Sequence, residues 1–308
     1  MSISGILLVD KPRGPTSHDV VEEVRKKLNQ RRVGHAGTLD PFATGLLIIG
    51  VGNATRLLEY LMNHNKVYRV KMKLGLITDT FDTTGKIEEE RQCNATKEEI
   101  IETIKSFVGS YVQVPPAYSA KKYKGERLYE LARQGKIVRL PPRQVTIYCI
   151  EDIEVEDLFV SFTVETSPGT YVRSLCMDIG YKLGCGATAV ELRRLSIGPF
   201  NVEDAVDVYS LSAEEITKRI IPISRVLHFP KVWINNEAKK RVLNGMKIHV
   251  KDILNHEPFE KGSIVQVFNE DVLLCLARAE RRSTFLKTLL QQERNEAVLK
   301  PFKVFKES

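Results

Sequence analysis

The chain has 308 residues, 43% of them hydrophobic, and a formal net charge of +7. This length suffices for one large domain or two ordinary ones, and the apolar content is enough for a proper core. No run of 18 apolar residues occurs and the first residues lack the basic segment of a secretory signal, so we expect neither a membrane span nor export.

Cysteine and histidine positions limit the chemistry further. The five cysteines are dispersed, and none forms a Cys-x-x-Cys pair. An odd, scattered set is typical of reduced thiols, which predicts a cytoplasmic protein. Neither the cysteines nor the six histidines have metal-ligand spacing, so we expect no metal and no cofactor.

Positive charge is concentrated near the C-terminus. Residues 230–308 contain 15 Lys and Arg against 10 Asp and Glu, a net of +5 within the total of +7. A solvated surface would account for this excess, and a nucleic-acid-binding surface is the sharper interpretation.

The first elements are a strand and a helix. The apolar segment Gly5–Val9 predicts a short strand that ends before Asp10 and Lys11. Thr16 and Ser17 can cap a helix that extends to about Leu28, because the apolar positions after them follow helical spacing.

Residues 31–56 are the most informative stretch. The apolar run Leu46–Ile49, closed by glycines, predicts a buried strand. Asp40 precedes it on a glycine-rich loop that Pro41 stiffens, close to His35 and among small residues that leave room for a flat ligand. Local sequence alone favours a structural turn for such an aspartate, and the glycines match no phosphate-binding fingerprint.

The next segments alternate between helix and strand patterns. We predict a short helix over Ala54–Leu61 and a half-buried strand over Lys66–Leu74, in which Tyr68 faces inward with the apolar set. A capping box, Thr96–Glu99, opens a further helix that we expect Gly109 to close.

Residues 115–143 form a basic segment. It contains eight cations, including Lys121 and Lys122, with two carboxylates and three interleaved tyrosines. Cations can contact phosphates and aromatic rings can stack on bases, which suits RNA. A charge run alone would equally fit a solvated helical hairpin.

The remaining chain predicts more strands. Two of them, Val145–Val155 and Leu158–Glu165, precede a turn and a helix that carries Arg173 in its first turn; another strand follows at Ala187–Ile197. Beyond residue 230 the pattern changes. A helix, Glu237–Asn244, is followed by short strands at residues 263–268, 272–277 and 298–304.

Several blocks together resemble one family. GHAGTLDPFATGLL, residues 34–47, is similar to the catalytic motif of the TruB family of tRNA pseudouridine synthases. Three more blocks, at residues 76–82, 115–133 and 169–175, occur in the family's order, and Lys11-Pro12 resembles its lysine–proline motif. The resemblance covers most of residues 1–200.

The resemblance implies roles for specific residues. Asp40 would be the nucleophile or base, Arg173 the cation that keeps it ionised, and Tyr68 a ring that stacks on the target base and assists removal of the C5 proton. The other expected site residues would contact the base, the RNA or the active-site loop: His35, Tyr171, Leu192, Lys11, Asp82, Lys121 and Lys122. Among them, we favour a loop-supporting role for Lys11 and a place near the RNA or the active-site network for Asp82.

The implied fold is mixed α/β. A catalytic domain around a largely antiparallel sheet would occupy residues 1–229, with a thumb-like insertion at about 117–143 that grips the T-arm. Residues 230–308 would form a small β-rich PUA-like domain that binds RNA.

The implied function is isomerisation of uridine 55 in the T-loop of tRNA by a monomer without an obligate protein partner. Two alternatives remain open. One is a guide-RNA-dependent pseudouridine synthase. The other is a non-catalytic tRNA-binding or tRNA-folding protein, for which Asp40 would be dispensable.

Overall fold

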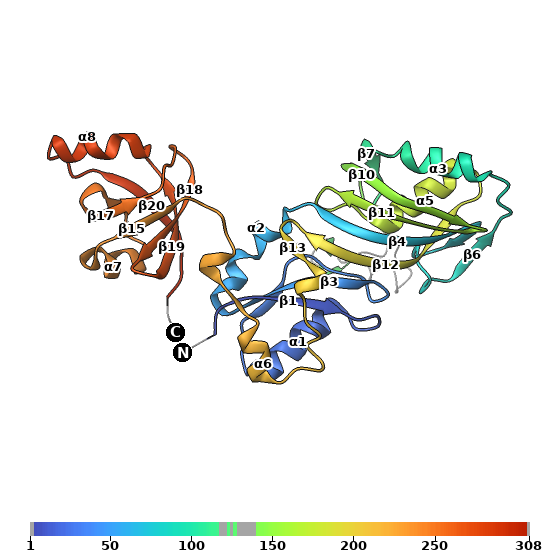
Figure 1. Ribbon diagram of the computed structural model, residues 1–308, viewed down its shortest axis with the longest axis horizontal. Coiled ribbons are helices and arrows are strands. Elements are labelled where there is room, and N and C mark those ends of the chain that lie inside the picture. Colours follow the sequence, from blue (N-terminus) through green and yellow to red (C-terminus); the bar gives the residue numbers. More distant parts are fainter. Residues whose placement is uncertain (1–2, 117–121, 124–125, 128–139, 307–308) are drawn as a thin grey trace.

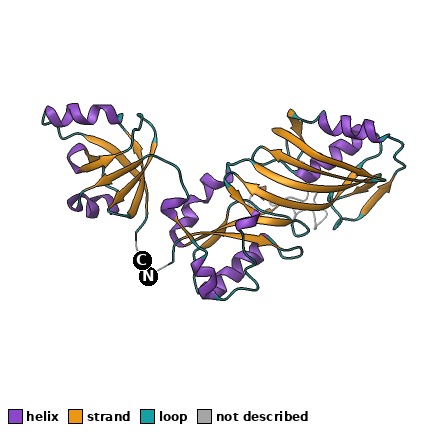
Figure 2. Ribbon diagram, in the orientation of Figure 1, coloured by secondary structure: helices purple, strands orange, loops and turns teal. Residues whose placement is uncertain are grey.

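Two β-sheets organise the protein, one of ten strands and one of six (Figures 1 and 2). The computed structural model describes residues 3–116, 122–123, 126–127 and 140–306. Helices are interspersed among runs of strands along this part of the chain, and nearly all strand pairs in the larger sheet are antiparallel, so the predicted mixed α/β fold is confirmed.

The larger sheet has one parallel contact. Its main path is β14 (Ile221–Pro222), β1 (Gly5–Lys11), β3 (Thr44–Val51), β12 (Ala187–Ile197), β4 (Lys66–Leu74), β11 (Phe159–Thr166), β10 (Arg143–Glu156) and β7 (Gly109–Gln113), with β2 (Val33–His35) beside β3 and β13 (Phe200–Asn201) beside β12. Strands β3 and β12 run parallel and pair at only two positions, Thr44 with Arg193 and Gly45 with Arg194. The sheet therefore splits between β3 and β12.

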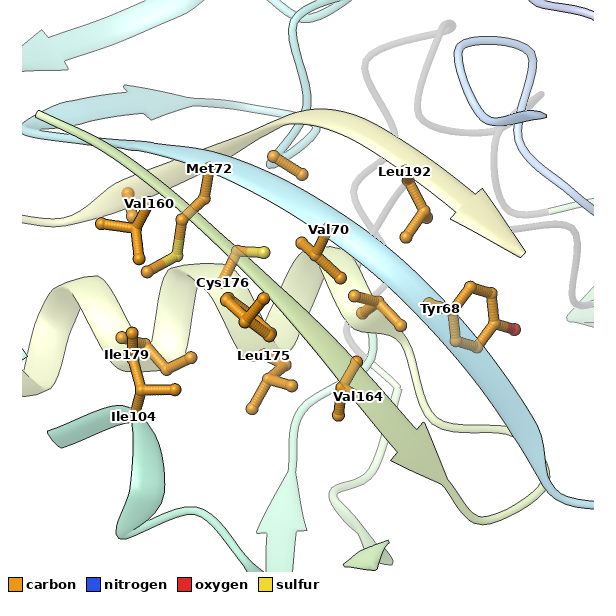
Figure 3. Packing of buried hydrophobic residues seen from close by; sticks show 14 of the residues in the cluster. Tyr68, Val70, Met72, Ile104, Val160, Val164, Leu175, Cys176, Ile179 and Leu192 are labelled. Carbon is orange, nitrogen blue, oxygen red and sulfur yellow. The ribbon is translucent and has the colours of Figure 1, made fainter. Parts of the chain in front are cut away.

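Strand β4 follows the predicted alternation residue for residue. Tyr68, Val70 and Met72 are buried, whereas the cations between them are half exposed. The apolar face packs against α5 (Val172–Lys182) and α3 (Lys97–Lys105), as Figures 1 and 3 show. Because helices cover one face of this half, the sheet presents its charged face outward.

The other half of the sheet, around β1 and β3, packs against α1 (Ser17–Leu28) and α6 (Ala213–Lys218). Thr16 and Asp19 form a capping box at the start of α1, which confirms the predicted start of this helix. The opposite face is covered by a 3₁₀ helix, η1 (Gly52–Leu57), and by α2 (Leu58–Met62).

Three predicted boundaries were wrong. Strand β1 continues through Lys11, because all seven of its residues pair with β3. The helix predicted over residues 54–61 is divided between η1 and α2. Helix α3 ends at Lys105, and Gly109 begins β7 instead of closing the helix.

Short elements connect the main ones. These are β5 (Leu76–Thr78) paired with β6 (Ile87–Glu90), β8 (Lys122–Tyr123) paired with β9 (Glu126–Arg127), η2 (Val202–Asp204) and η3 (Ile223–Arg225).

The smaller sheet lies at the other end of the molecule (Figure 1). Its order is β16 (Ile248–His249), β20 (Ala297–Val304), β19 (Val272–Ala279), β18 (Ile264–Asn269), β15 (Lys231–Ile234) and β17 (Ile253–His256), accompanied by α7 (Asn236–Leu243), η4 (Val250–Asp252), η5 (Ser283–Phe285) and α8 (Leu286–Gln291). We call residues 231–306 the C-terminal module. The predicted boundary at residue 230 and the PUA-like assignment stay predictions.

The C-terminal module contacts the part of the protein built around the ten-stranded sheet, which we call the larger sheet unit, through apolar and polar groups. Leu276 and Phe305 pack in the same cluster as Ile6 and Leu57. Asn53 donates through Nδ2 to the carbonyl of Lys306 at 2.9 Å. Within the described ranges, no helix is long and apolar enough to cross a membrane.

Candidate active site

Three segments meet where β3 and β12 diverge. The first is the loop that carries Asp40 into β3. The second is the turn after β5, where Asp82 forms a bridge with Ala189 of β12 and the amide of Ala189 donates to Phe81 at 3.0 Å. The third is the first turn of α5, which carries Arg173. The split in the sheet thus brings together residues that are far apart in sequence.

Asp40 and Arg173 form a two-point ion pair. Nε of Arg173 lies 2.8 Å from Oδ2 of Asp40, and Nη2 donates to Oδ1 at 3.1 Å. The arginine side chain is 4% exposed, whereas the aspartate side chain is 32% exposed. The guanidinium is therefore fixed within the protein, and the carboxylate that it holds remains accessible from solvent.

Asp82 holds the same arginine from the other side. Nη1 of Arg173 donates to Oδ2 of Asp82 at 2.9 Å, and the other carboxylate oxygen accepts from the amide of Thr84 at 2.9 Å and the hydroxyl of Thr80 at 3.0 Å. The Asp82 side chain is 4% exposed. Asp82 thus joins Asp40 in a network in which one guanidinium serves two carboxylates, and its predicted place in the active site stays a prediction.

Buried polar side chains hold the Asp40 loop. Nζ of Lys11 donates to the carbonyls of Pro12 and Pro15, both at 2.8 Å, and to that of Pro41 at 3.4 Å. Burial lowers the pKa of Lys11 to about 8, even though the nearby Asp40 carboxylate raises it. With no exposed surface, Lys11 is placed to support the loop.

Tyr68 and Leu192 lie on the same face of neighbouring strands (Figure 3). Leu192 pairs with Val70, two residues along β4 from Tyr68. Both side chains are less than a tenth exposed and share an apolar cluster with Leu39 and Phe42 of the Asp40 loop. The structure thus brings these two predicted site residues beside the loop.

Tyr171 is fixed at the start of α5. Gln113, at the end of β7, accepts from the amide of Tyr171 at 2.8 Å and donates to its carbonyl at 3.1 Å. The guanidinium of Arg143 lies 5.5 Å from the centre of the tyrosine ring. The backbone and the ring of Tyr171 are thus both held, two residues before Arg173.

The other predicted residues are less defined. His35 ends the short strand β2 and is partly buried, five residues before Asp40. Lys121 lies outside the described residues; Lys122 lies in β8, and its side chain is not described. In the described part of the chain, no group of three or more metal-ligating side chains is placed to hold an ion.

Sequence reasoning missed the residues that support the site: Ser17, Gln113, Arg143 and Arg194. Most of their contacts join distant segments, so no local pattern marks them. Arg194 did carry a signal, because the alternation in β12 puts it on the same inward side as Leu192. An inward arginine in a buried strand is unusual enough to be noticed.

Comparison with known proteins gives one family over most of the chain. The family model "TruB family pseudouridylate synthase (N terminal domain)" matches residues 25–172, and "tRNA pseudouridylate synthase B C-terminal domain" matches residues 173–227. The chain is 61% identical over 303 residues to tRNA pseudouridine synthase B of Thermotoga maritima, covering 98% of both proteins. The corresponding protein of Thermosipho melanesiensis is 55% identical over 306 residues, covering 98% of this chain and 99% of the relative.

Solved structures are similar over nearly the whole chain. A Cbf5–Nop10–Gar1 complex matches with a TM-score of 0.70 and 31% identity, covering 98% of this chain and 85% of the other. An H/ACA ribonucleoprotein bound to a substrate RNA matches with the same TM-score, 29% identity and the same coverage. The matching models, relatives and fold lead to one conclusion: the chain belongs to the TruB family of pseudouridine synthases, which are isomerases.

Proposed function

We propose that the protein converts uridine 55 in the T-loop of tRNA to pseudouridine, with Asp40 as the catalytic carboxylate. The observation that carries the proposal is the two-point pairing of a partly exposed Asp40 with a buried Arg173, on the loop that resembles the family's catalytic motif. The relatives named tRNA pseudouridine synthase B, at 61% and 55% identity, support tRNA as the substrate.

The reaction exchanges one glycosidic bond for another. The bond from N1 of uracil to C1′ of ribose breaks, and a bond from C5 to C1′ forms. The C5 proton leaves and N1 gains a proton, so atoms and electrons balance without an oxidant. A carboxylate, a pocket that retains the detached uracil, and access to the nucleotide are what the protein has to supply.

Asp40 has to be ionised to act as nucleophile or base. A pocket dry enough to retain uracil disfavours a carboxylate, and an adjacent cation offsets that cost. Arg173 supplies a guanidinium that stays charged at any working pH and that matches the carboxylate with two donors. Its second partner, Asp82, fixes the guanidinium in the orientation that this pairing requires.

The pocket walls come from three elements. In the proposed complex Tyr68 of β4 stacks on the flipped uracil, and Leu192 of β12 and Tyr171 at the start of α5 close the other sides. Flipping costs a few kcal/mol of lost stacking, which these contacts offset. His35 occupies part of the space left by the extruded nucleotide. Tyr68 also assists removal of the C5 proton.

The RNA-binding surface would extend beyond the pocket. The basic segment at 117–143, with Lys121 and Lys122, grips the T-arm, and the C-terminal module with its excess of cations contributes further phosphate contacts. The protein acts as a monomer in the cytoplasm. Guide-RNA dependence is the second candidate, because one similar solved structure is an H/ACA ribonucleoprotein bound to a substrate RNA. The higher identity to the proteins named tRNA pseudouridine synthase B favours the first candidate.

The decisive experiment replaces Asp40. Asp40→Asn and Asp40→Ala are incubated with T-arm RNA labelled with tritium at C5 of uridine, and tritium release is measured beside filter binding. We expect both variants to bind RNA like the parent and to lose about 1,000-fold or more in rate, because they remove the reacting group.

The controls separate the competing functions. Parental release by Asp40→Asn would refute the catalytic assignment. A parent that binds the RNA but releases no tritium until a guide RNA is added would move the function to the guide-dependent class. Binding without release under every condition would support a binding or folding role.

A further inference from the structure

Arg194 is a fully buried arginine next to the Asp40 loop. It is 1% exposed and lies on β12, two residues beyond Leu192. Its Nε donates to the carbonyl of Leu46 at 2.7 Å. Its Nη2 donates to the carbonyl of Gly37 at 3.2 Å, and Nη1 reaches that of Thr38 at 3.5 Å. One side chain thus joins the strand after Asp40 to the loop before it.

Burying this guanidinium is costly. An ion taken out of water costs several kcal/mol, and a well-packed apolar side chain is often at least as stable as a buried charge. Within the described residues, Arg194 is offset by backbone carbonyls and takes part in no ion pair with a carboxylate. Stability of the sheet alone is a poor reason for an arginine here, whereas the need to fix two consecutive loop carbonyls is a good one.

The backbone around Arg194 is equally tight. Residue 194 is one of the two positions at which β12 contacts β3. A Cβ on Gly45 would lie 2.2 Å from the carbonyl oxygen of Arg194, and Gly45 has a φ of +100°, so this close approach requires glycine. The contact joins the strand that carries Leu192 to the strand that follows Asp40.

A second buried side chain completes the hold on the loop. Oγ of Ser17, which is 2% exposed, accepts from the amide of Leu39 at 2.9 Å and donates to its carbonyl at 3.1 Å. Arg194 holds residues 37 and 38, Ser17 holds residue 39, and the amide of Ala43 donates to the carbonyl of Asp40 at 3.1 Å. The carboxylate is thereby presented from an immobilised backbone.

We propose that Arg194 is a positioning residue that sets the place of Asp40 relative to the pocket wall formed by Leu192. It touches neither substrate nor the reacting atoms. Its guanidinium fixes the loop that carries the carboxylate, and its own strand carries the wall against which uracil rests. The catalytic consequence rests on the proposed function, whereas the effect on the loop does not.

The test makes the same substitution, arginine to lysine, at two neighbouring positions of β12. Arg194→Lys keeps a charge and loses the fork that spans three carbonyls. Arg193→Lys is the matched control, because Arg193 is 41% exposed and pairs with Asp10 on the outer side of the strand. The single-turnover rate of tritium release at saturating T-arm RNA, the dissociation constant for that RNA and the melting temperature are measured for each.

We expect Arg194→Lys to slow the single-turnover step by about 100-fold, because a misplacement near 1 Å costs about that factor. Its RNA affinity should stay at the parental value, and Arg193→Lys should match the parent in both. A core variant, Ile147→Val, on strand β10, which pairs with β7 and β11 and not with β3 or β12, controls for stability. A rate loss in Arg194→Lys no larger than that of Ile147→Val would overturn the proposal.

Hydrogen exchange gives a readout that does not need activity. Amides of residues 36–43 should exchange faster in Arg194→Lys than in the parent and in Arg193→Lys, with the rest of the sheet unchanged. Unchanged exchange in this peptide would also overturn the proposal. A parent that is inactive on T-arm RNA would count against the proposed function, and hydrogen exchange would still decide whether Arg194 positions the loop.

Discussion

The two ends of the molecule each contain a buried aspartate paired with an arginine, and the two pairs differ in charge balance. In the C-terminal module, Asp252 accepts from Arg241 at 2.7 Å and from the amide of His249 at 2.9 Å. In the larger sheet unit, Asp82 shares Arg173 with a second carboxylate, Asp40. The first arrangement has one arginine for one carboxylate, whereas the second has one arginine for two.

The two arrangements also differ in which group reaches solvent: the arginine in the C-terminal module, and a carboxylate beside Arg173. Arg241 is 35% exposed and its aspartate 3%, so the pair ties a helix to a turn at the surface. Arg173 and Asp82 are both 4% exposed, and the excess carboxylate, Asp40, is the one that reaches solvent. The pair of Arg241 with one carboxylate is what stabilisation of the fold requires. Arg173 is almost fully buried and also holds a second carboxylate that solvent reaches, as the proposed catalytic role of Asp40 requires.

Replacing each arginine by lysine should separate the two cases most widely. In Arg173→Lys a single ammonium cannot bond Asp40 at two points while holding Asp82, so the single-turnover rate should fall by about 100-fold or more. In Arg241→Lys the exposed ammonium can still reach Asp252, and the rate should not change. Tritium release from saturating T-arm RNA measures both.

Equal rates for Arg173→Lys and the parent would show that the two-point pairing is not required for the chemistry. Filter binding on the same samples guards against a second explanation, because a loss of RNA affinity would lower the rate only below saturation.

Replacing the buried aspartate of each arrangement, Asp82 or Asp252, by asparagine should give a smaller difference between the two, seen mainly in stability. Asp82→Asn takes a charged partner from a buried arginine and should lower the free energy of unfolding by about 2–3 kcal/mol. Asp252→Asn leaves an arginine that water can reach, so a loss of about 1–2 kcal/mol is expected. Only Asp82→Asn should also slow the reaction, by about tenfold for each 1.4 kcal/mol of lost transition-state stabilisation.

Urea unfolding monitored by tryptophan fluorescence and circular dichroism measures the stabilities. Trp233 reports on the C-terminal module alone, which allows the two losses to be assigned to their own parts of the molecule. An unchanged single-turnover rate in Asp82→Asn would mean that Asp40 alone orients Arg173.

These contrasts also show what sequence can and cannot supply. The alternation in residues 66–74 predicted strand β4 and the inward Tyr68, because one buried face imposes a period of two. The turn predicted after the second of two strands placed Arg173 in the first turn of the helix that follows, which is α5. Such features are determined by residues that are neighbours in the chain, so they can be recognised from the sequence alone.

The anchors of the site depend on contacts between distant residues. Ser17 and Leu39 are 22 positions apart, and Arg194 and Thr38 are 156 apart. Lys11 was expected in a loop after the first strand, yet it completes that strand, because pairing with Gly45 of β3 outweighs the proline that follows it. The resemblance identified Asp40, but what holds it in place became visible only once β3 and β12 were seen to meet.

A third aspartate, which is only partly buried and has no arginine among its described contacts, extends the comparison to pH. Asp178 of α5 accepts from the hydroxyl of Tyr111 at 3.3 Å, and burial raises the pKa of its carboxyl to about 6. The folded protein therefore binds a proton more tightly here than the unfolded chain does, and this contribution to stability is lost as the pH rises from about 4 through 6.

Asp178→Asn removes that titration. Relative to the parent, the variant should gain stability as the pH rises from 4 to 7, by about 1–2 kcal/mol once solvent screening is allowed for, and the difference should level off above pH 7. Melting temperatures of both proteins between pH 4 and 8 measure it, with Asp252→Asn as the arginine-paired control. If the difference in melting temperature between Asp178→Asn and the parent stayed constant with pH, burial would not raise the pKa of Asp178. The three aspartates would then differ in their hydrogen-bond partners and not in how their stability contributions depend on pH.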